Sequence, residues 1–338
     1  MLDDVSLIAL LVAMGLYAAA FIAFALDLAR RSALVADAAT AAARQPSAVG
    51  ATAARRGGAT ATLEREPGSS GRDRAATGPD APVAAGRSLS LNVAMVLLGV
   101  GFVAHAVATV LRGLAASRVP WANMYEFAMT GTLLILSVYL IVLTRRDLRF
   151  LGTFVTGLIL ILLGIAVVQY RVEVAPLPPS LQSYWLVIHV FVAALGTGFF
   201  ALAFALSGVQ LLQFRRESLA ADARAAKMRF LATLPDSVTL ESMAYRLNIV
   251  GFIFWTFTLM AGAIWAERAW GRYWGWDTKE VWTFIIWVLY AGYIHARATR
   301  GWRGSRSAWL AIIGFSAVMF NFGIVNVFFK GLHTYSGL

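Results

Sequence analysis

Eight apolar segments, most of them close to twenty residues long, recur along this chain. A helix of about twenty mainly apolar residues is long enough to cross the hydrocarbon core of a bilayer. Hydrophobic residues make up 59% of the sequence, whereas soluble domains have about half. The sequence therefore predicts an all-α integral membrane protein with about eight transmembrane helices. The predicted spans are residues 5–26, 89–111, 127–143, 150–168, 185–214, 247–266, 281–296 and 309–329.

Basic residues divide the connections between these spans into two alternating sets. One set holds 22 of the 29 Lys and Arg residues, and the other holds 7. The positive-inside rule places the richer set in the cytoplasm. Both termini and the connection between the sixth and seventh spans are then expected outside. The net charge of +11 therefore reflects orientation and contact with anionic lipids, and no nucleic-acid partner is expected. The arginine-rich connections are residues 27–88, 144–149, 215–246 and 297–308.

One of these connections differs in composition from the rest of the chain. Residues 27–88 are rich in Ala, Gly, Thr and Arg and almost free of large apolar side chains, so they cannot bury enough surface to fold alone. We expect a first transmembrane helix over 1–26, a disordered cytoplasmic linker over 27–88 and a seven-helix body over 89–338. The connection 215–246 has the pattern of an amphipathic helix on the inner membrane surface, broken near Pro235.

The stretch AWGRYWGWDTKEVW concentrates indole rings in the predicted external connection between the sixth and seventh spans. A single tryptophan at this depth is typical of the aromatic belt of membrane proteins. A belt does not require glycines between the indoles, and glycine lets a flat ligand approach the backbone closely. The candidate ligand-binding residues of this pattern are Trp270, Gly271, Trp274, Gly275 and Trp276.

Charged side chains accompany these indoles. The segment DTKE has the form of a capping box, with Asp277 as N-cap and Glu280 at the third helical position. The same two carboxylates are the candidates for proton transfer in catalysis. Arg268, Arg272 and Lys279 are expected to pair with acidic groups of a ligand. Flat aromatic walls with a basic rim at a bilayer boundary suit a large, planar, partly anionic molecule, and heme fits that description.

The four histidines form two candidate pairs of iron ligands. His189 and His333 are both predicted on the side of the tryptophan-rich connection, where two imidazoles would form a bis-histidine iron site; alternatively, each is a solvated interfacial side chain. His105 and His295 lie within the second and seventh spans, where an ionisable group is costly and suggests function, although a neutral imidazole can also pack there. Helical rise places His105 about 24 Å from the inner end of its span, whereas His295 lies near the inner end of its own.

The segment WGRYWGWDTKEVWTFIIWVLYAGYIHAR resembles the WWD signature of the heme-handling proteins of cytochrome c biogenesis. The similarity is greatest to the CcsA (ResC) branch, the membrane partner in system II cytochrome c synthases, whose bacterial members are sometimes named CcsB. It extends over residues 89–338 and includes PWANMYEF at 120–127, LQSYWLVIH at 181–189 and GLHTYSG at 331–337. Thr278 departs from the family, which usually has proline after the aspartate.

The resemblance implies roles for the matching residues. His189 and His333 resemble an external pair that holds heme iron beneath the WWD connection. His105 and His295 resemble an intramembrane pair that binds a second heme, or the same heme earlier. The implied protein lies in the bacterial plasma membrane, moves heme b to its external face and presents it to the Cys-x-x-Cys-His segment of apocytochrome c. Its implied activity is that of a holocytochrome c synthase, of the heme lyase type.

The resemblance also implies partners. They are a ResB-type membrane protein with a large external domain, in the usual naming CcsB, and a thioredoxin-like thiol reductant. The chain contains no cysteine, so any thiol chemistry belongs to a partner. Two other functions fit the same residues. One is a heme exporter without ligation activity, and the other is a bis-histidine membrane cytochrome that passes electrons from quinol to an external acceptor.

Overall fold

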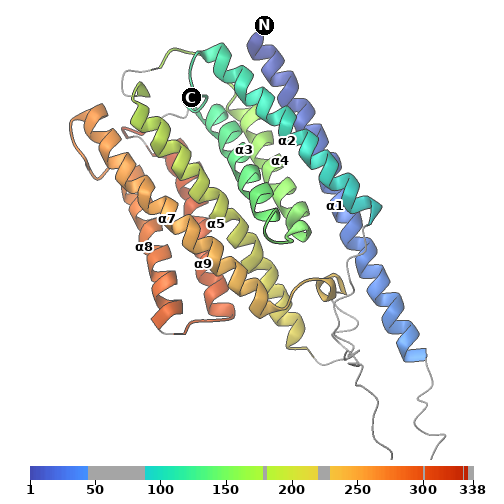
Figure 1. The fold of residues 1–338 in the computed structure, drawn as a ribbon. Helices are drawn as coiled ribbons and strands as arrows, with labels where there is room; N and C mark the ends of the chain where they lie inside the picture. The colour runs from blue at the N-terminus through green and yellow to red at the C-terminus, as the bar shows by residue number, and fades with distance from the viewer. Residues whose placement is uncertain (45–87, 178–180, 220–228, 300, 330, 334–338) are drawn as a thin grey trace, which may run out of the picture.

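The structure, a computed structural model, is a bundle of long helices (Figure 1). Every regular element in the described residues is helical. Seven of these helices are long and apolar enough to cross a membrane, which confirms the predicted fold class of an all-α, multi-pass membrane protein. The described residues are 1–44, 88–177, 181–219, 229–299, 301–329 and 331–333.

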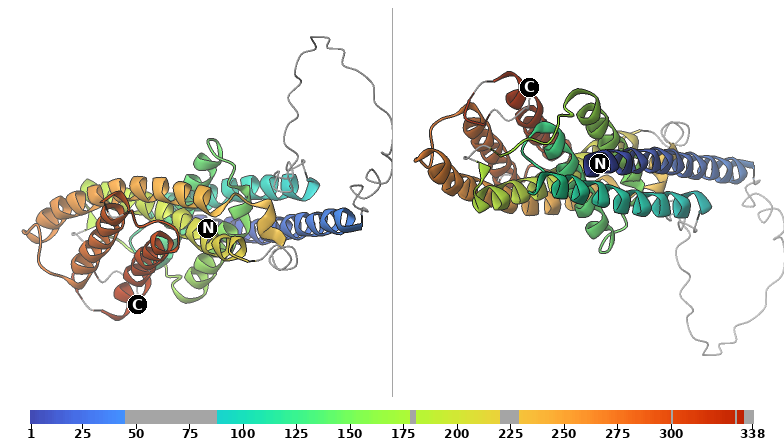
Figure 2. Two further views of the ribbon diagram at one scale, coloured as in Figure 1. Left: turned by 90° about the horizontal axis from the view of Figure 1, so that it is seen from below. Right: turned by 90° about the horizontal axis from the view of Figure 1, so that it is seen from above.

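One edge of the bundle is a pair of helices from the beginning of the chain. α1 (Leu2–Arg44) and α2 (Leu89–Ala116) lie side by side along most of their length. α3 (Met124–Leu143) and α4 (Gly152–Gln169) pack against each other, and α4 also packs against α1 (Figures 1 and 2). These four helices bury their apolar side chains in one shared core.

The other part of the bundle is centred on α5 (Tyr184–Glu217), which packs against α3, α7 (Ser237–Trp270) and α9 (Ser305–Phe320). α8 (Thr278–Thr299) completes this part against α7 and α9. The short elements are η2 (Arg149–Leu151), η4 (Arg229–Thr233), the π-helical turn η5 (Asn321–Val325) and α10 (Asn326–Phe328).

Side-chain caps fix where several helices begin. The side chains of Ser88, Asn123, Ser183 and Asp236 each accept a hydrogen bond from a backbone N–H in the first turn that follows. Such caps satisfy N–H groups that have no partner within the helix. The short polar residues that separate the apolar runs therefore determine the start of the bundle's helices.

The seventh predicted span is a helix, but it differs from the other seven. α8 is 22 residues long and packs within the bundle, yet it is not among the segments that are apolar enough to cross a membrane by composition. The reason lies in its sequence, because Lys279, Glu280 and Arg297 occupy its ends and tyrosines and tryptophans occupy much of its length.

The first helix is longer than predicted. α1 does not end at residue 26 but continues to Arg44. Asp27 is buried, pairs with Arg31 at 2.7 Å and accepts a hydrogen bond from the Ser88 hydroxyl. The charged residues that marked the predicted end of the span are thus accommodated within the helix. The remainder of the predicted linker, 45–87, lies outside the described residues.

The predicted surface helix over 215–246 is also different in the structure. α5 continues to Glu217 and α7 begins at Ser237, so both ends of this connection extend long helices of 34 residues each. η4 lies between them, and residues 220–228 are outside the described part of the chain. A helix of about twenty residues spans the bilayer core, so α5 and α7 are long enough to project beyond it.

Described parts of the two sets of connections lie at opposite ends of the bundle. Asp3 contacts Arg112 at the end where the tryptophan-rich connection also lies. At the opposite end, Glu241 accepts a hydrogen bond from the backbone N–H of Gly304. Which end faces the cytoplasm stays a prediction of the positive-inside rule.

Candidate functional site

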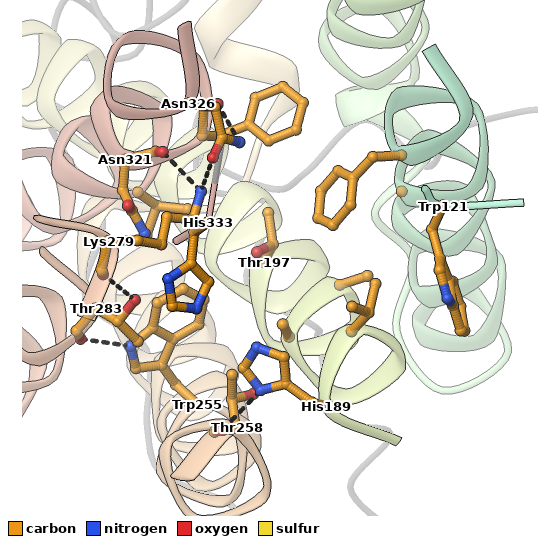
Figure 3. A pocket seen from close by; sticks show the side chains of 18 of the residues that line it. Trp121, His189, Thr197, Trp255, Thr258, Lys279, Thr283, Asn321, Asn326 and His333 are labelled. Carbon is orange, nitrogen blue, oxygen red and sulfur yellow. Dashed lines mark hydrogen bonds between the residues drawn. The ribbon is translucent and has the colours of Figure 1, made fainter. Parts of the chain in front are cut away.

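A deep cavity lies where the two parts of the bundle meet (Figure 3). Side chains of α3, α4, α5, α7, α8, α9 and η5 line it, and it holds about 1640 Å³ of empty space, including the part that opens to solvent. Its walls are mainly apolar, with a few polar groups, as is typical of sites for small molecules and cofactors. The polar groups include His189, Lys279, Asn321, Asn326 and His333.

His189 lies on α5 and faces this cavity (Figure 3). Its Nδ1 lies 3.0 Å from the carbonyl oxygen of Thr258 on α7. Because a carbonyl only accepts hydrogen bonds, Nδ1 carries the proton and Nε2 keeps its lone pair. Gly262 provides the space for this arrangement, since a Cβ there would lie 2.7 Å from the imidazole.

His333 reaches the same cavity from the end of the chain. Its Nδ1 lies 2.6 Å from Oδ2 of Asp277, and its backbone N–H donates to the same oxygen at 3.2 Å. The hydrogen bond from His333 is the main reason that the pKa of Asp277 lies below its usual value. The ionised carboxylate accepts the Nδ1 proton, so His333 also keeps its lone pair on Nε2.

A buried tryptophan joins the two imidazoles. The ring of Trp265 is stacked with His189 at a centroid distance of 5.9 Å and meets His333 edge to face at 5.5 Å. Trp270 meets both Trp265 and His333 edge to face, at 4.7 Å and 4.8 Å. The structure therefore brings the predicted external pair together on one indole. The sequence analysis did not single out Trp265, Gly262 or Thr258.

The tryptophans of the connection between α7 and α8 occupy different places. Trp274 lines the cavity, whereas Trp270 lies behind His333. Trp276 is 74% exposed and is absent from the cavity lining. Its backbone has a φ of +60°, a left-handed conformation that is uncommon for a bulky residue, and its ring meets Trp274 at 5.8 Å.

The two glycines of the connection serve the protein's own structure. Gly271 has a φ of +71° and caps the C-terminus of α7, as is common for glycine. Gly275 leaves room for the guanidinium of Arg272, which lies where a Cβ would be. The flat group that approaches Gly275 in the structure is thus the guanidinium of Arg272.

The side chains of the predicted basic rim, Arg268, Arg272 and Lys279, mostly contact other residues of this chain. Arg268 lies over the ring of Tyr184 at 5.5 Å, and Arg272 lies 3.6 Å from Glu280. Neither arginine lines the cavity, whereas Lys279 does. Lys279 Nζ donates to the backbone carbonyl of Asn321 at 3.0 Å and to Asn326 Oδ1 at 2.6 Å.

The predicted capping box is half present. Glu280 accepts hydrogen bonds from the backbone N–H of Asp277 at 3.1 Å and of Gly275 at 2.8 Å, as the motif requires of its third helical position. The Asp277 side chain, however, accepts from His333. Asp277 therefore occupies the predicted N-cap position directly before α8, but the main partner of its carboxylate is His333.

A further polar group was not predicted. Asn321 opens the π-helical turn η5, its side chain is 4% exposed, and its Oδ1 has no hydrogen-bond partner among the described residues. Asn321 also lines the cavity. Single π-helical turns occur frequently at functional sites, and a buried polar atom without a partner requires an explanation such as a ligand or water.

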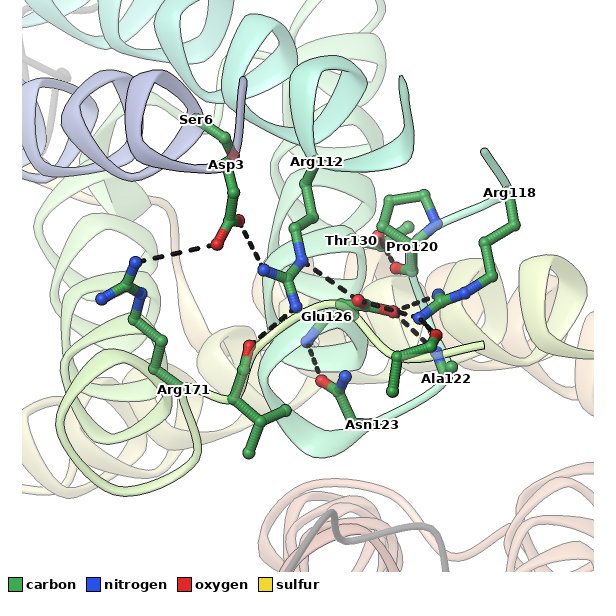
Figure 4. A network of polar contacts seen from close by, with 12 residues as sticks. Asp3, Ser6, Arg112, Arg118, Pro120, Ala122, Asn123, Glu126, Thr130 and Arg171 are labelled. Carbon is green, nitrogen blue, oxygen red and sulfur yellow. Dashed lines mark hydrogen bonds and ion pairs between the residues drawn. The ribbon is translucent and has the colours of Figure 1, made fainter. Parts of the chain in front are cut away.

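The segment PWANMYEF contributes another wall of the cavity, through Trp121, Met124 and Phe127. A buried ionic network fixes this wall (Figure 4). Glu126 is fully buried, and its carboxylate binds Arg112 at 3.0 Å and accepts from the backbone N–H of Ala122 at 3.0 Å. The network therefore holds the loop that carries Trp121.

The predicted intramembrane pair is not assembled in the structure. His105 is fully buried, with Nδ1 3.2 Å from the Tyr17 hydroxyl and Nε2 3.0 Å from the carbonyl oxygen of Met129. His295 is exposed near the end of α8. Neither residue lines the cavity. α2 and α8 occupy opposite edges of the bundle in Figure 1, and a heme held by both imidazoles stays a prediction.

Comparisons with known proteins agree on one family. The family described as Cytochrome C assembly protein matches residues 121–333. The chain is 35% identical to the cytochrome c biogenesis protein CcsA of Guillardia theta over 245 residues, which are 67% of this chain and 80% of that protein. It is 34% identical to CcsA of Chlorella vulgaris over 257 residues, 68% of this chain and 81% of that protein.

A solved structure has a similar fold. It is the cytochrome c heme lyase CcmF, with a TM-score of 0.60, 14% sequence identity and coverage of 100% of this chain. This chain spans 50% of that structure, and the low identity makes the likeness one of fold alone. The matched region extends from the PWANMYEF wall to the second external histidine, and on this agreement the chain belongs to the cytochrome c assembly protein family, as its tryptophan-rich segment predicted.

Proposed function

We propose that this protein is the membrane subunit of a system II cytochrome c synthase. It moves heme b to the external face of the bacterial plasma membrane and presents it for covalent attachment to apocytochrome c. A role in cytochrome c biogenesis follows from the family. The observation that supports heme transfer by this chain is that His189 and His333 both contact the ring of Trp265 and line one cavity.

The residues of the cavity fit heme chemically. Both imidazoles use Nδ1 for a protein contact, which leaves the two Nε2 lone pairs as ligands for iron. The apolar walls suit the macrocycle. Lys279 and the unpartnered Asn321 Oδ1 supply polar groups within the same lining, where a donor such as Lys279 can meet a propionate.

The protein's task in the reaction is orientation. Each thiol of a Cys-x-x-Cys-His segment adds across one heme vinyl group, so that sulfur binds one vinyl carbon and a proton binds the other. Holding the vinyl groups in register with the two cysteines turns encounters into intramolecular steps, which can contribute several kcal/mol. Among this chain's residues, Trp265 and Trp270 hold the imidazoles from behind, and Trp274 forms part of the wall.

The composition of the chain supports a need for partners. It has no cysteine, so the thiols and their reduction come from elsewhere. We propose a ResB-type membrane protein with an external domain and a thioredoxin-like reductant as partners, with apocytochrome c as the substrate protein.

The test is reconstitution. The full chain is purified with a ResB-type partner, loaded with heme and mixed with a reduced apocytochrome c. The expected product is an apocytochrome band that keeps heme stain after denaturation. An apocytochrome with both cysteines replaced by alanine is the control and should stay unstained. Heme released without a thioether would instead indicate an exporter. Heme that stays bound and is reduced by a quinol would indicate a membrane cytochrome.

A further inference from the structure

The two external histidines differ in the acceptor that each Nδ1–H meets. His333 donates to a carboxylate, Asp277 Oδ2, at 2.6 Å. His189 donates to a neutral backbone carbonyl, that of Thr258, at 3.0 Å. A hydrogen bond to an ionised acceptor is shorter and roughly twice as strong as one between neutral groups. It also raises the basicity of the imidazole as a metal ligand.

Several contacts keep Asp277 in this role. Its carboxylate accepts both the side-chain and the backbone N–H of His333. Its own backbone N–H is held by Glu280 at 3.1 Å. Gly331 lies so close to the Asp277 carboxylate that a Cβ there would collide with it. Asp277 and the segment 331–333 are therefore built around one another, independently of any ligand.

We propose that Asp277 makes His333 the stronger of the two iron ligands, so that His189 is the ligand that yields to the histidine of the incoming apocytochrome. This inference rests on the proposed function. One iron–nitrogen bond breaks as another forms, and no electron is transferred. His189 leaves as a neutral imidazole whose Nδ1–H keeps its bond to Thr258. Asp277 acts through His333 and is a positioning residue.

The first test uses free imidazole as the probe. Heme-loaded His189→Gly and His333→Gly variants of the full chain are titrated with imidazole, and the Soret shift gives each affinity. In His333→Gly the added imidazole can donate to Asp277, whereas in His189→Gly it can donate only to a carbonyl. The difference between charged and neutral hydrogen bonds predicts about tenfold tighter binding in His333→Gly.

The control variants isolate the carboxylate. Adding Asp277→Asn to His333→Gly should remove the tenfold advantage. Adding Asp147→Asn should preserve it, because Asp147 is 58% exposed and pairs with its neighbour Arg149. Equal affinities in the two glycine variants, or tighter binding in His189→Gly, would overturn the inference. A wild-type chain that binds no heme would instead overturn the proposed function.

A second measurement does not depend on either glycine variant. The reduction potential of the bound heme should rise in Asp277→Asn, because a less basic His333 stabilises the ferric state less, and it should not move in Asp147→Asn. An unchanged potential in Asp277→Asn would contradict the assigned role.

A peptide identifies the ligand that is released. The probe is an apocytochrome peptide with alanine in place of both cysteines, which can ligate iron but forms no thioether. It should bind heme-loaded His189→Gly more tightly than wild type, since no iron–nitrogen bond must break first. It should bind His333→Gly less tightly than His189→Gly, because the position of His189 is still occupied there. The reverse order would assign the release to His333.

Discussion

His189 and His105 are both helical histidines, yet their surroundings differ in every respect that matters for metal binding. His105 has a hydrogen-bond partner on each ring nitrogen and does not line the cavity described above. His189 has a partner on Nδ1 alone and lines a large cavity. A ligand-binding imidazole needs an unoccupied lone pair, a fixed orientation and space in front of it. The external pair has all three, whereas His105 has only the fixed orientation.

The largest expected effect is the loss of heme when a histidine of the external pair is replaced. Replacement of His189 or His333 by glycine removes one of two iron ligands and should lower the heme retained per chain, which the Soret absorbance measures. Added imidazole should restore it in both variants, because each glycine leaves a space that the free ring can fill. His105→Gly serves as the comparison, and no rescue is expected there, since its space lies among Tyr17 and Met129.

A result that reverses this order would be informative. If His105→Gly lost heme and regained it with imidazole, while His189→Gly kept its full spectrum, the intramembrane histidine would be the iron ligand. The site described around Trp265 would then be structural.

A smaller loss of heme affinity is expected when Gly262, which contacts His189, is replaced and both histidines are kept. A Cβ at Gly262 would lie 2.7 Å from the His189 ring, so Gly262→Val must tilt the imidazole away from its contact with Thr258. Disturbing the group that orients a metal ligand costs about 10- to 100-fold in affinity. Heme affinity should fall by about tenfold, measured by competition with a soluble heme acceptor.

The matched control for this variant is Gly164→Val on α4. A Cβ at Gly164 meets nothing within 4 Å, so the two substitutions share the same change in helix propensity and differ in their neighbours. An equal loss of heme affinity in both variants would show that Gly262 has no special relation to His189.

The pairing of His189 and His333 could be predicted because it depends only on where each residue lies along the sequence relative to the ends of the spans. His189 and His333 follow span boundaries, and hydrophobic length alone places both at the same end. The sequence also contained an unused signal. Thr258, Gly262 and Trp265 are spaced at i, i+4 and i+7, so they share one helix face. That face is the one that carries the acceptor, the space and the indole for His189.

Other features could not be predicted from the sequence, because they depend on which helices are neighbours. The capping-box pattern of DTKE predicted a side-chain cap, but the competing partner of Asp277 lies more than fifty positions away at His333. α1 continues past residue 26, and its buried Asp27 accepts a hydrogen bond from Ser88, the last residue of the predicted linker. The separation of His105 and His295 agrees with their predicted depths, since helical rise already placed them apart.

Replacement of the buried His105 is expected to lower the stability of the protein. His105→Ala removes the partner of the Tyr17 hydroxyl in the core and one of two donors to the Met129 carbonyl, which keeps the Thr132 hydroxyl. An unsatisfied buried group costs about 1–3 kcal/mol, so the melting temperature in detergent should fall while heme per chain stays constant. A lower heme content per chain in His105→Ala, with an unchanged melting temperature, would favour a role of His105 as an iron ligand.

The smallest expected effect is the loss of stability when only the hydrogen bond at Nδ1 of His105 is removed. Because the Met129 carbonyl accepts from Nε2, the Nδ1 lone pair must accept from the Tyr17 hydroxyl. Tyr17→Phe keeps the ring that packs on His105 at 5.9 Å and removes only that donor. A hydrogen bond between helices in a membrane protein contributes about 0.6 kcal/mol on average, so a small drop in melting temperature is expected, well below that of His105→Ala. The double variant should lose less than the sum of the two, because both changes remove the same bond. A fully additive loss would mean that Tyr17 and His105 stabilise the first two helices independently, and that Nδ1 of His105 is as free as the Nε2 atoms of the external pair.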